Sequence, residues 1–179
     1  MEENGVSMAN VKGEVDQLAS QGVSVLCFAQ NGRLLGLIGV SDVMKPTAAS
    51  AVAQLKELGV TPYLLTGDRR EAAQNVAKQA GISEVFSEVM PADKSDKVRA
   101  LQQDGSRVAM VGDGINDAPA LKQADVGIAV GSGTDIAIET ADVVLAGNRM
   151  TDIPTAIRLS RAVIRNIKDN LFWAFFYNV

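Results

Sequence analysis

The sequence predicts an α/β protein: a parallel sheet with helices on both faces, preceded by a β-hairpin and followed by a long C-terminal helix. Two observations predict this class. From Thr47 onward, helical and β-rich segments alternate, as in folds whose parallel strands are joined by helical crossovers. The apolar fraction of 47% and the charged fraction of 21% are those of an ordinary folded domain.

The hairpin is predicted near the start of the chain. Residues 23–29 and 33–40 are β-rich and are joined through Gln30-Asn31-Gly32. Asn-Gly is a strong short-range hairpin signal because both residues tolerate positive φ. Cys27 in the first of these strands is expected to be a small apolar residue rather than a functional one.

The alternating region supplies the elements of the predicted sheet. In such a sheet, active groups lie at the carboxyl ends of the strands. The predicted helices are 47–58, 69–79, 93–102 and a short one from Ala118, and the predicted strands are 62–65, 85–89, 107–111, 126–130 and 142–145.

The last predicted helix spans residues 153–179 and changes character along its length. It begins with a basic stripe of Arg158, Arg161, Arg165 and Lys168, and becomes wholly apolar from Leu171. A helix that enters a membrane from its positive, cytoplasmic side has this pattern. Since a full span needs roughly 20 apolar residues, the expectation is that the chain stops partway through a membrane helix.

Composition excludes several classes of function. The net charge of −4, from 17 basic and 21 acidic residues, gives no basic field for nucleic acid. A single cysteine and no histidine exclude a disulfide framework and remove the commonest transition-metal ligand. The N-terminus has no apolar segment of the kind found in secretory signals. The chemistry must therefore use carboxylates, lysine and threonine.

Two carboxylates and an amide follow the apolar strand that ends at Val111. The turn is Gly112-Asp113-Gly114-Ile115-Asn116-Asp117. Its glycines let backbone and ligand approach closely, and carboxylate oxygens are the ligands that Mg²⁺ prefers. We therefore predict Asp113 and Asp117 as Mg²⁺ ligands, within a cofactor-binding loop that includes Gly114 and Asn116.

A second polar turn, Thr66-Gly67-Asp68, follows an earlier strand, just before a helix begins. Its hydroxyl and backbone amides are suited to phosphate oxygens, although an ordinary helix cap would have the same appearance. Lys94 follows the next strand and is placed to neutralise a transferring phosphoryl group. We predict Thr66, Gly67, Asp68 and Lys94 as catalytic residues.

This order of hydroxyl, lysine and paired aspartates resembles the haloacid dehalogenase-like superfamily of phosphoryl-transfer enzymes. The motifs are similar, more narrowly, to those of heavy-metal P-type ATPases. By this resemblance Asp113 and Asp117 match the magnesium-site aspartates, Thr66 and Asp68 the phosphate-contacting loop, and Lys94 the phosphate-binding lysine. The segments that carry it are LLTGDRREAAQNVAKQAGI, EVMPADKSDKV, VAMVGDGINDAPALKQADVGIAVGSGTDIAIETADVVL and RLSRAVIRNIKDNLFWAFFYN.

Within that branch, Tyr177-Asn178 resembles the transmembrane metal site of copper(I) exporters. As the transported ion, silver is not distinguishable from copper by this resemblance, and zinc or cadmium is the next candidate. The resemblance implies Mg²⁺ as cofactor, ATP as substrate and Cu⁺ as the transported ion. It also implies a cytoplasmic domain of an integral membrane protein, with membrane lipid and the remainder of the pump as partners. The chain alone is then expected to be cytoplasmic or membrane-associated.

The sequence departs from the family at one decisive place. The phosphorylated aspartate of the family lies in Asp-Lys-Thr-Gly-Thr, a string this chain lacks, so the chain alone is expected to be inactive. Residues 1–41 then resemble a remnant of the nucleotide-binding domain with its hinge. Residues 42–150 resemble a phosphorylation domain without its first motif, and 151–179 a basic helix leading into a truncated membrane helix.

Two alternatives to a fragment of a copper-transporting ATPase stay open. A stand-alone haloacid dehalogenase-like phosphatase would need Asp42 as its nucleophile. The following Val43 and Met44 do not match the lysine of the pumps or the second acid of the phosphatases, so a hinge is the favoured interpretation of Asp42. A non-catalytic module that binds Mg²⁺ or phosphate and regulates a complete pump is the other alternative.

Overall fold

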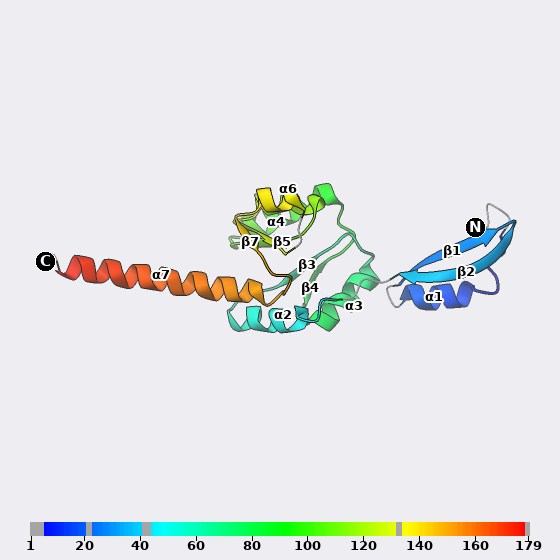
Figure 1. Cartoon of the computed structure of the whole chain (residues 1–179), viewed down its shortest axis with the longest axis horizontal. Coiled ribbons are helices and arrows are strands. Elements are labelled where there is room, and N and C mark those ends of the chain that lie inside the picture. Colours follow the sequence, from blue (N-terminus) through cyan, green and yellow to red (C-terminus); the bar gives the residue numbers. More distant parts are fainter. Residues whose placement is uncertain (1–5, 21–22, 41–43, 132–133, 178–179) are drawn as a thin grey trace. The chain divides into compact units, whose positions relative to one another are not determined.

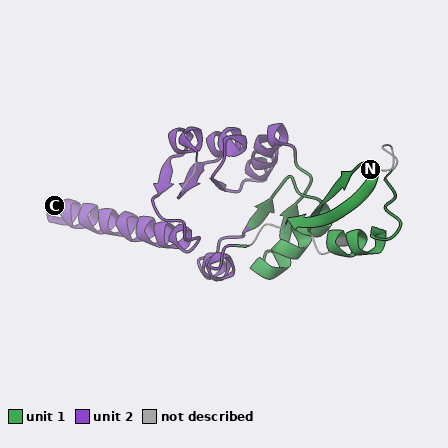
Figure 2. Ribbon diagram, turned by 45° about the vertical axis from the view of Figure 1, so that its right-hand side comes forward, with its two compact units in different colours: residues 1–44, 63–89 green, residues 45–62, 90–179 purple. Residues whose placement is uncertain are grey.

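The computed structural model describes residues 6–20, 23–40, 44–131 and 134–177 (Figure 1). The chain divides into two compact units, shown in Figure 2. Unit 1 comprises Met1–Met44 and Tyr63–Val89, and unit 2 comprises Lys45–Pro62 and Met90–Val179. Each unit is described by itself.

Unit 1 contains the predicted hairpin. Strands β1 (Ser24–Gln30) and β2 (Arg33–Val40) pair antiparallel. Asn31 and Gly32 at the turn have φ of 51° and 75°, the positive values that a two-residue hairpin turn requires. The hairpin prediction is therefore confirmed. Helix α1 (Lys12–Ser20) contacts β1 and was not predicted, because its sequence lacks a marked apolar stripe.

A parallel strand pair forms the rest of unit 1. Strand β3 (Tyr63–Leu65) pairs with β4 (Glu84–Phe86), and α3 (Arg70–Ala80) is the crossover between them. Its buried face consists of alanines at helical spacing, Ala73, Ala77 and Ala80. The predicted strand 85–89 was too long at its carboxyl end. Glu88 has a φ of 56°, which is incompatible with a continuing strand.

Unit 2 is built on a three-stranded parallel sheet in the order β5-β6-β7. Ile128 and Val130 of β6 pack with Leu55 and Ile153 on one face. On the other face, a Cβ added at Gly127 would lie 2.7 Å from the carbonyl oxygen of Leu121. The helix that contains Leu121, residues 118–123, therefore packs closely on the strand. Helices therefore cover both faces, as predicted. The strands are β5 (Ala109–Gly112), β6 (Val126–Val130) and β7 (Val143–Leu145), and the helices that pack on them include α2 (Ala48–Glu57), α5 (Ala118–Gln123) and α7 (Asp152–Tyr177).

Two further helices complete unit 2. Helix α4 (Lys94–Gln103) follows the 3₁₀ turn η2 (Pro91–Asp93), and α6 (Asp135–Thr140) joins β6 to β7. Reciprocal bonds fix α4 beside α5: the Gln102 amide donates to the Gln123 carbonyl at 3.1 Å, and the Gln123 amide donates to Gln102 Oε1 at 2.9 Å. This contact determines where the N-terminus of α4 lies within the unit.

The predicted parallel strands are confirmed, and the described residues arrange them in two hydrogen-bonded ladders. Among the described residues, β3-β4 and β5-β6-β7 are separate hydrogen-bonded sheets. Alternation of helix and strand determines the direction of the strands but not which strands pair. Within the part of the chain that the structure describes, β5 pairs with β6 alone.

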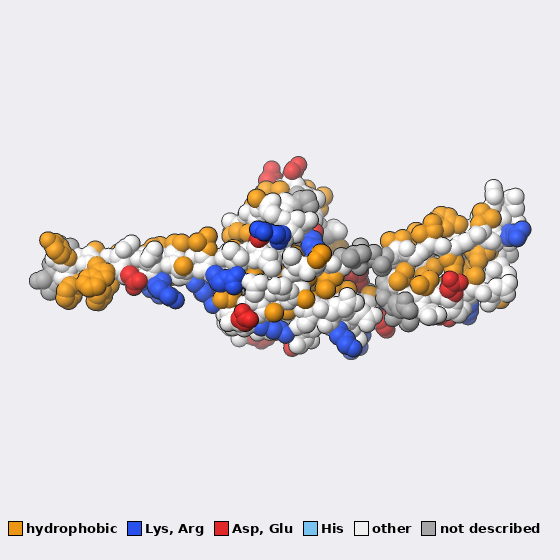
Figure 3. Space-filling view, turned by 60° about the horizontal axis from the view of Figure 1, so that its bottom comes forward, with side chains coloured by type: hydrophobic (Ala, Val, Ile, Leu, Met, Phe, Trp, Pro, Cys, Tyr) orange, Lys and Arg blue, Asp and Glu red, His pale blue; other side chains and the backbone are white. Residues whose placement is uncertain are grey.

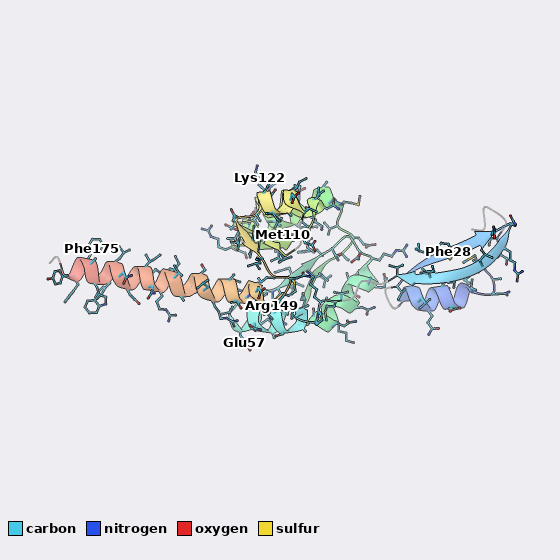
Figure 4. The ribbon with its side chains drawn as sticks, viewed as in Figure 1. Phe28, Glu57, Met110, Lys122, Arg149 and Phe175 are labelled. Carbon is cyan, nitrogen blue, oxygen red and sulfur yellow. The ribbon has the colours of Figure 1, made fainter. Side chains whose placement is uncertain are left out.

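Helix α7 is anchored at its start and exposed beyond it. Ile153 and Pro154 are buried, whereas the apolar residues of its C-terminal part are 52% to 92% exposed: Leu171, Phe172, Trp173, Phe175, Phe176 and Tyr177. Figure 3 shows apolar side chains gathered at this end, and in Figure 4 Phe175 projects from the helix into open space. No helix within the described residues is long and apolar enough to cross a membrane.

Candidate functional site

The strongest candidate site lies at the carboxyl end of β5. The strand ends at Gly112, and the 3₁₀ turn η3 (Ile115–Asp117) follows at once. A Cβ added at Gly112 would lie 2.7 Å from Asp117 Cβ and 3.0 Å from Asp117 Oδ2. The absence of a side chain at position 112 is therefore what allows the Asp117 carboxylate to lie against the strand end.

Lys94 and Asp117 form an ion pair. Lys94 Nζ donates to Asp117 Oδ1 at 2.6 Å, and the two side chains are only 15% and 14% exposed. A charge-assisted bond of this length in a partly dehydrated site is among the stronger polar contacts of a protein. The pair also connects the first residue of α4 to the last residue of η3. The sequence predicted both residues for the site but not their direct contact.

Asp113 is held through its backbone and leaves its carboxylate exposed. Its carbonyl oxygen accepts a hydrogen bond from the backbone amide of Thr134 at 3.0 Å. Thr134 in turn caps α6, because its hydroxyl accepts from the Ala137 amide at 3.4 Å. The loop backbone is therefore fixed between β5 and α6 while the acidic group stays accessible.

The other two predicted loop residues lie in the same turn. Gly114 is extended, with φ of −120°, and its carbonyl accepts from the Asp117 amide at 3.1 Å, closing the turn. Asn116 is exposed. Asp113, Gly114, Asn116 and Asp117 are thus brought together as the sequence predicts.

A pocket of about 280 Å³ opens beside this turn, entirely within unit 2. Its charged lining residues are both aspartates and Lys45, and the other lining residues carry no charge. Its lining comprises Lys45, Ala48, Val111, Gly112, Asp113, Asp117, Val130 and Met150.

The two aspartates of the pocket fit magnesium. Asp113 and Asp117 offer hard carboxylate oxygens, and Asp117 Oδ1 already accepts from Lys94. Among the residues that the structure describes, no cluster of three or more acidic, cysteine or histidine side chains is placed to hold a metal. Mg²⁺ usually binds through one or two carboxylates with waters and phosphate oxygens, so two aspartates are a sufficient protein contribution.

Thr66, Gly67 and Asp68 lie in unit 1, at the end of β3. Thr66 Oγ1 donates to Asp68 Oδ2 at 2.8 Å, and the Asp68 amide lies 3.1 Å from Thr66 Oγ1. The carbonyl of Thr66 accepts from the Val89 amide at 3.1 Å. The turn is thus held by its own side chains and by the segment after β4. Residue 69, not Asp68, is the cap of α3.

The remaining predicted positions are more weakly placed. Tyr177 is 92% exposed at the end of α7, and Asn178 and Asp42 lie outside the described residues. Lys45 in the pocket lining was missed. Its signal in the sequence is slight, because a lysine before a helix is usually a solvated surface residue.

This chain is similar in sequence to a family model and to several metal-transporting ATPases. A family model described as haloacid dehalogenase-like hydrolase matches residues 1–125. Copper-transporting ATPase 1 of Rhizobium meliloti (strain 1021) is 52% identical over 175 residues, which are 98% of this chain and 21% of that protein. A copper-exporting P-type ATPase of Vibrio cholerae serotype O1 is 46% identical over 178 residues, 99% of this chain and 20% of that protein.

Solved structures match as well. A zinc-transporting PIB-type ATPase in its E2.Pi state is 41% identical with a TM-score of 0.82, covering 92% of this chain and 27% of that one. The catalytic domain of the CPx-ATPase CopB-B is 32% identical with a TM-score of 0.63, covering 75% of this chain and 57% of that one. The chain spans about a fifth of the curated relatives it matches.

Proposed function

This chain belongs to the haloacid dehalogenase-like hydrolase family, and on that premise we propose that it is a segment of an ATP-driven copper(I)-exporting P-type ATPase. It supplies the magnesium-binding and phosphate-stabilising half of the phosphorylation site. The observation that carries the proposal is the Lys94–Asp117 ion pair of 2.6 Å at the end of β5, beside Asp113 and the pocket.

The chemistry of phosphoryl transfer explains why these groups suffice for half of a site. The protein's part in such a transfer is mostly positioning and electrostatic stabilisation. Lys94 carries a cation that Asp117 holds in place. By the resemblance of its motif alone, Thr66 is proposed to offer a hydroxyl to phosphate oxygens. Asp113 and Asp117 would hold Mg²⁺, which when bound supplies further positive charge next to the phosphoryl oxygens.

The carboxylate that receives the phosphate is proposed to come from another segment of the pump. Support comes from the missing Asp-Lys-Thr-Gly-Thr string and from β5, whose second edge has no strand partner among the described residues. In this proposal residues 42–150 form the incomplete phosphorylation domain. Residues 1–41 are a remnant of the nucleotide-binding domain, and 151–179 lead toward the membrane.

Copper is proposed as the transported ion because the matched copper-transporting proteins reach 52% identity, against 41% for the matched zinc-transporting structure. Tyr177 and Asn178 are proposed to contribute to the metal site in the membrane. Contact with lipid is proposed for the exposed apolar end of α7, which follows its basic stripe, the order expected at a cytoplasmic membrane face.

A chimaera tests the proposal. The matching segment of the Rhizobium meliloti protein is replaced by this chain, and ATP hydrolysis that depends on copper(I) is measured in membranes. We expect hydrolysis to persist, and Asp113→Asn within the inserted segment to reduce it by about a hundredfold or more, since it removes electrostatic stabilisation at the reacting group.

The matched control is Asp104→Asn, which changes an exposed aspartate after α4 and should leave hydrolysis unchanged. A chimaera that folds but hydrolyses no ATP would contradict the proposal. The isolated chain, incubated with labelled ATP and Mg²⁺, should form no hydroxylamine-sensitive phosphoprotein. Label that disappears in Asp42→Asn would instead support a stand-alone phosphatase.

A further inference from the structure

A lysine other than Lys94 lines the pocket beside the two aspartates. Lys45 lines it together with Asp113 and Asp117 and precedes α2 by a short turn, in which the Ala48 amide donates to the Lys45 carbonyl at 2.9 Å. The side chain is half-buried. It therefore reaches the pocket from the α2 side, whereas Lys94 belongs to α4.

The position of Lys45 is fixed by the loop that follows β7. Lys45 Nζ donates to Asn148 Oδ1 at 2.6 Å. Nearby, the Met150 amide donates to Thr47 Oγ1 at 3.0 Å. These two contacts join the start of α2 to the residues before α7 at two successive points, so the lysine is held by segments far apart in the chain.

The backbone of Asn148 packs against the end of β6. Gly131, at the end of β6, has a φ of 51°, and a Cβ there would lie 3.2 Å from Asn148 Cα. The loop therefore packs directly on the backbone of the sheet. Because Lys45 is hydrogen-bonded to Asn148, its side chain loses less conformational freedom when it binds an anion than a lysine on an open surface does.

The two lysines differ in the charge of their partners. Lys94 is paired with the Asp117 carboxylate at 2.6 Å. Lys45 is bonded to a neutral amide, and among the described residues no carboxylate lies within ion-pair distance of its ammonium. An ammonium has three donors, so the bond to Asn148 leaves Lys45 with its full charge and with further donors for a ligand.

We propose that Lys45, positioned by Asn148, is a second cationic ligand for the phosphoryl group or inorganic phosphate that this pocket receives. The inference rests on the proposed function and adds a residue to it. The half-site then contains an ion-paired lysine, which is held rigidly but partly neutralised, and an amide-tethered lysine, which keeps its positive charge for an oxyanion.

The test is binding of inorganic phosphate to the full chain in the presence of Mg²⁺, followed by phosphorus NMR. We expect Lys45→Met to weaken the phosphate affinity about tenfold, the effect of one lost charge-assisted hydrogen bond. Lys45→Arg should stay within about threefold of the wild type because it keeps a cation. Asn148→Ala should weaken binding about threefold, since the charge stays but its tether is lost.

The matched control is Lys122→Met, which removes the same charge from an exposed position on α5; in Figure 4 the labelled Lys122 points outward from unit 2. Equal phosphate affinity in Lys45→Met and wild type would overturn the inference, as would an equal loss in Lys122→Met. If Lys45→Met fails to fold, Asn148→Ala decides, because this variant keeps the lysine and loses only its tether, and a phosphate affinity equal to that of the wild type would overturn the inference.

Failure of the inference and failure of the proposed function are distinguishable through Lys94→Met. Loss of phosphate binding in Lys94→Met but not in Lys45→Met leaves the proposed function standing and removes Lys45 from it. A wild-type chain that binds no phosphate at any concentration overturns both.

Discussion

The two polar turns that follow strands β3 and β5 look alike in sequence and differ in how the fold holds them. In the turn after β3, the side chains of Thr66 and Asp68 bond to each other, at 2.8 Å, while the backbone of the turn is bonded to residues 86–89. In the turn after β5, Asp117 is paired with Lys94 from another helix and lies against a strand end where a Cβ at Gly112 would be 2.7 Å from Asp117 Cβ.

This difference separates a turn whose polar side chains bond to each other from a turn whose carboxylate is held by another helix. A self-bonded hydroxyl and carboxylate can rearrange around a ligand at small cost, because both are near solvent. A largely buried ion pair cannot lose one partner without leaving a charge in a poorly hydrated place. The turn after β5 should therefore be the more rigid and the more sensitive to substitution, and the following predictions test that.

The largest effect is expected from Lys94→Met, which leaves the Asp117 carboxylate largely buried without its cation. We expect the free energy of unfolding to fall by about 2 kcal/mol, less than for a completely buried pair because some solvent still reaches it. Thr66→Val removes the two hydrogen bonds of the Thr66 hydroxyl, both between exposed groups, and should cost about 0.5 kcal/mol. Urea unfolding of both variants measures the contrast.

Lys122→Met is the control for the removal of a lysine in that experiment, and it should lie close to the wild type because it is exposed. Similar losses in Lys94→Met and Thr66→Val would mean that the two turns are equally local, against the comparison.

Glycine substitutions sharpen the same contrast. Gly112→Ala places a methyl group 2.7 Å from Asp117 Cβ, so either the strand end or the turn must move, at about 1.5 kcal/mol. At Gly67 the nearest atom, the Val89 carbonyl oxygen, would be 3.4 Å away, an ordinary contact, and we expect a change below about 0.5 kcal/mol. Thermal unfolding of the two variants compares them. A destabilised Gly67→Ala with an unaffected Gly112→Ala would reverse the order.

Magnesium binding should distinguish the two turns by function. Asp113→Ala is expected to lower the affinity for Mg²⁺ about tenfold, because only one carboxylate of the proposed pair then remains. Asp68→Ala, in the turn after β3, should leave it near the wild-type value. Calorimetric titration of the full chain with Mg²⁺ gives both affinities, and undiminished binding in Asp113→Ala would count against the site.

Sequence patterns predicted the elements that depend on neighbouring residues. Asn31-Gly32 specified the hairpin, and the apolar run 126–130 matched β6 at both ends. Patterns did less well where distant contacts decide. Helix α1 has no strong stripe, and β4 ends early because of the conformation of Glu88. The parallel direction of the strands was predicted, whereas their division into two ladders among the described residues depends on tertiary packing.

The candidate site shows the same division. The type and order of its residues indicate phosphoryl chemistry from the sequence alone, since Asp113 and Asp117 share one short turn. The Lys94–Asp117 contact and the position of Lys45 depend on α4 packing against α5 and on the loop before α7. Neither packing contact leaves a local signal in the sequence, so only the three-dimensional fold reveals them.

The smallest effect on stability is expected at Asp125, which directly precedes β6 and so lies at the amino end of that strand. Asp125 accepts hydrogen bonds from the Val108 amide at 2.9 Å, the Gln102 side chain at 3.0 Å and Arg107 at 2.8 Å. These donors, the Val108 amide above all, hold the pKa of Asp125 well below its ordinary value. A carboxylate with a lowered pKa in the folded state stabilises the fold above the pKa of the unfolded chain, about 3.9, and loses that contribution as the pH falls further.

Asp125→Asn should therefore unfold at a lower temperature than the wild type near about pH 6, and the difference should shrink at about pH 2.5, where protonation begins to favour the unfolded wild type. Asp104→Asn, at an exposed position after α4, should follow the wild type at both pH values. A difference between Asp125→Asn and wild type that stays constant over this range would show that Asp125 acts through the shape of its hydrogen bonds and not through its charge. In that case Asp125 would act through neutral hydrogen bonding, as the side chains of the turn after β3 do, and the Lys94–Asp117 ion pair at the end of β5 would differ from both.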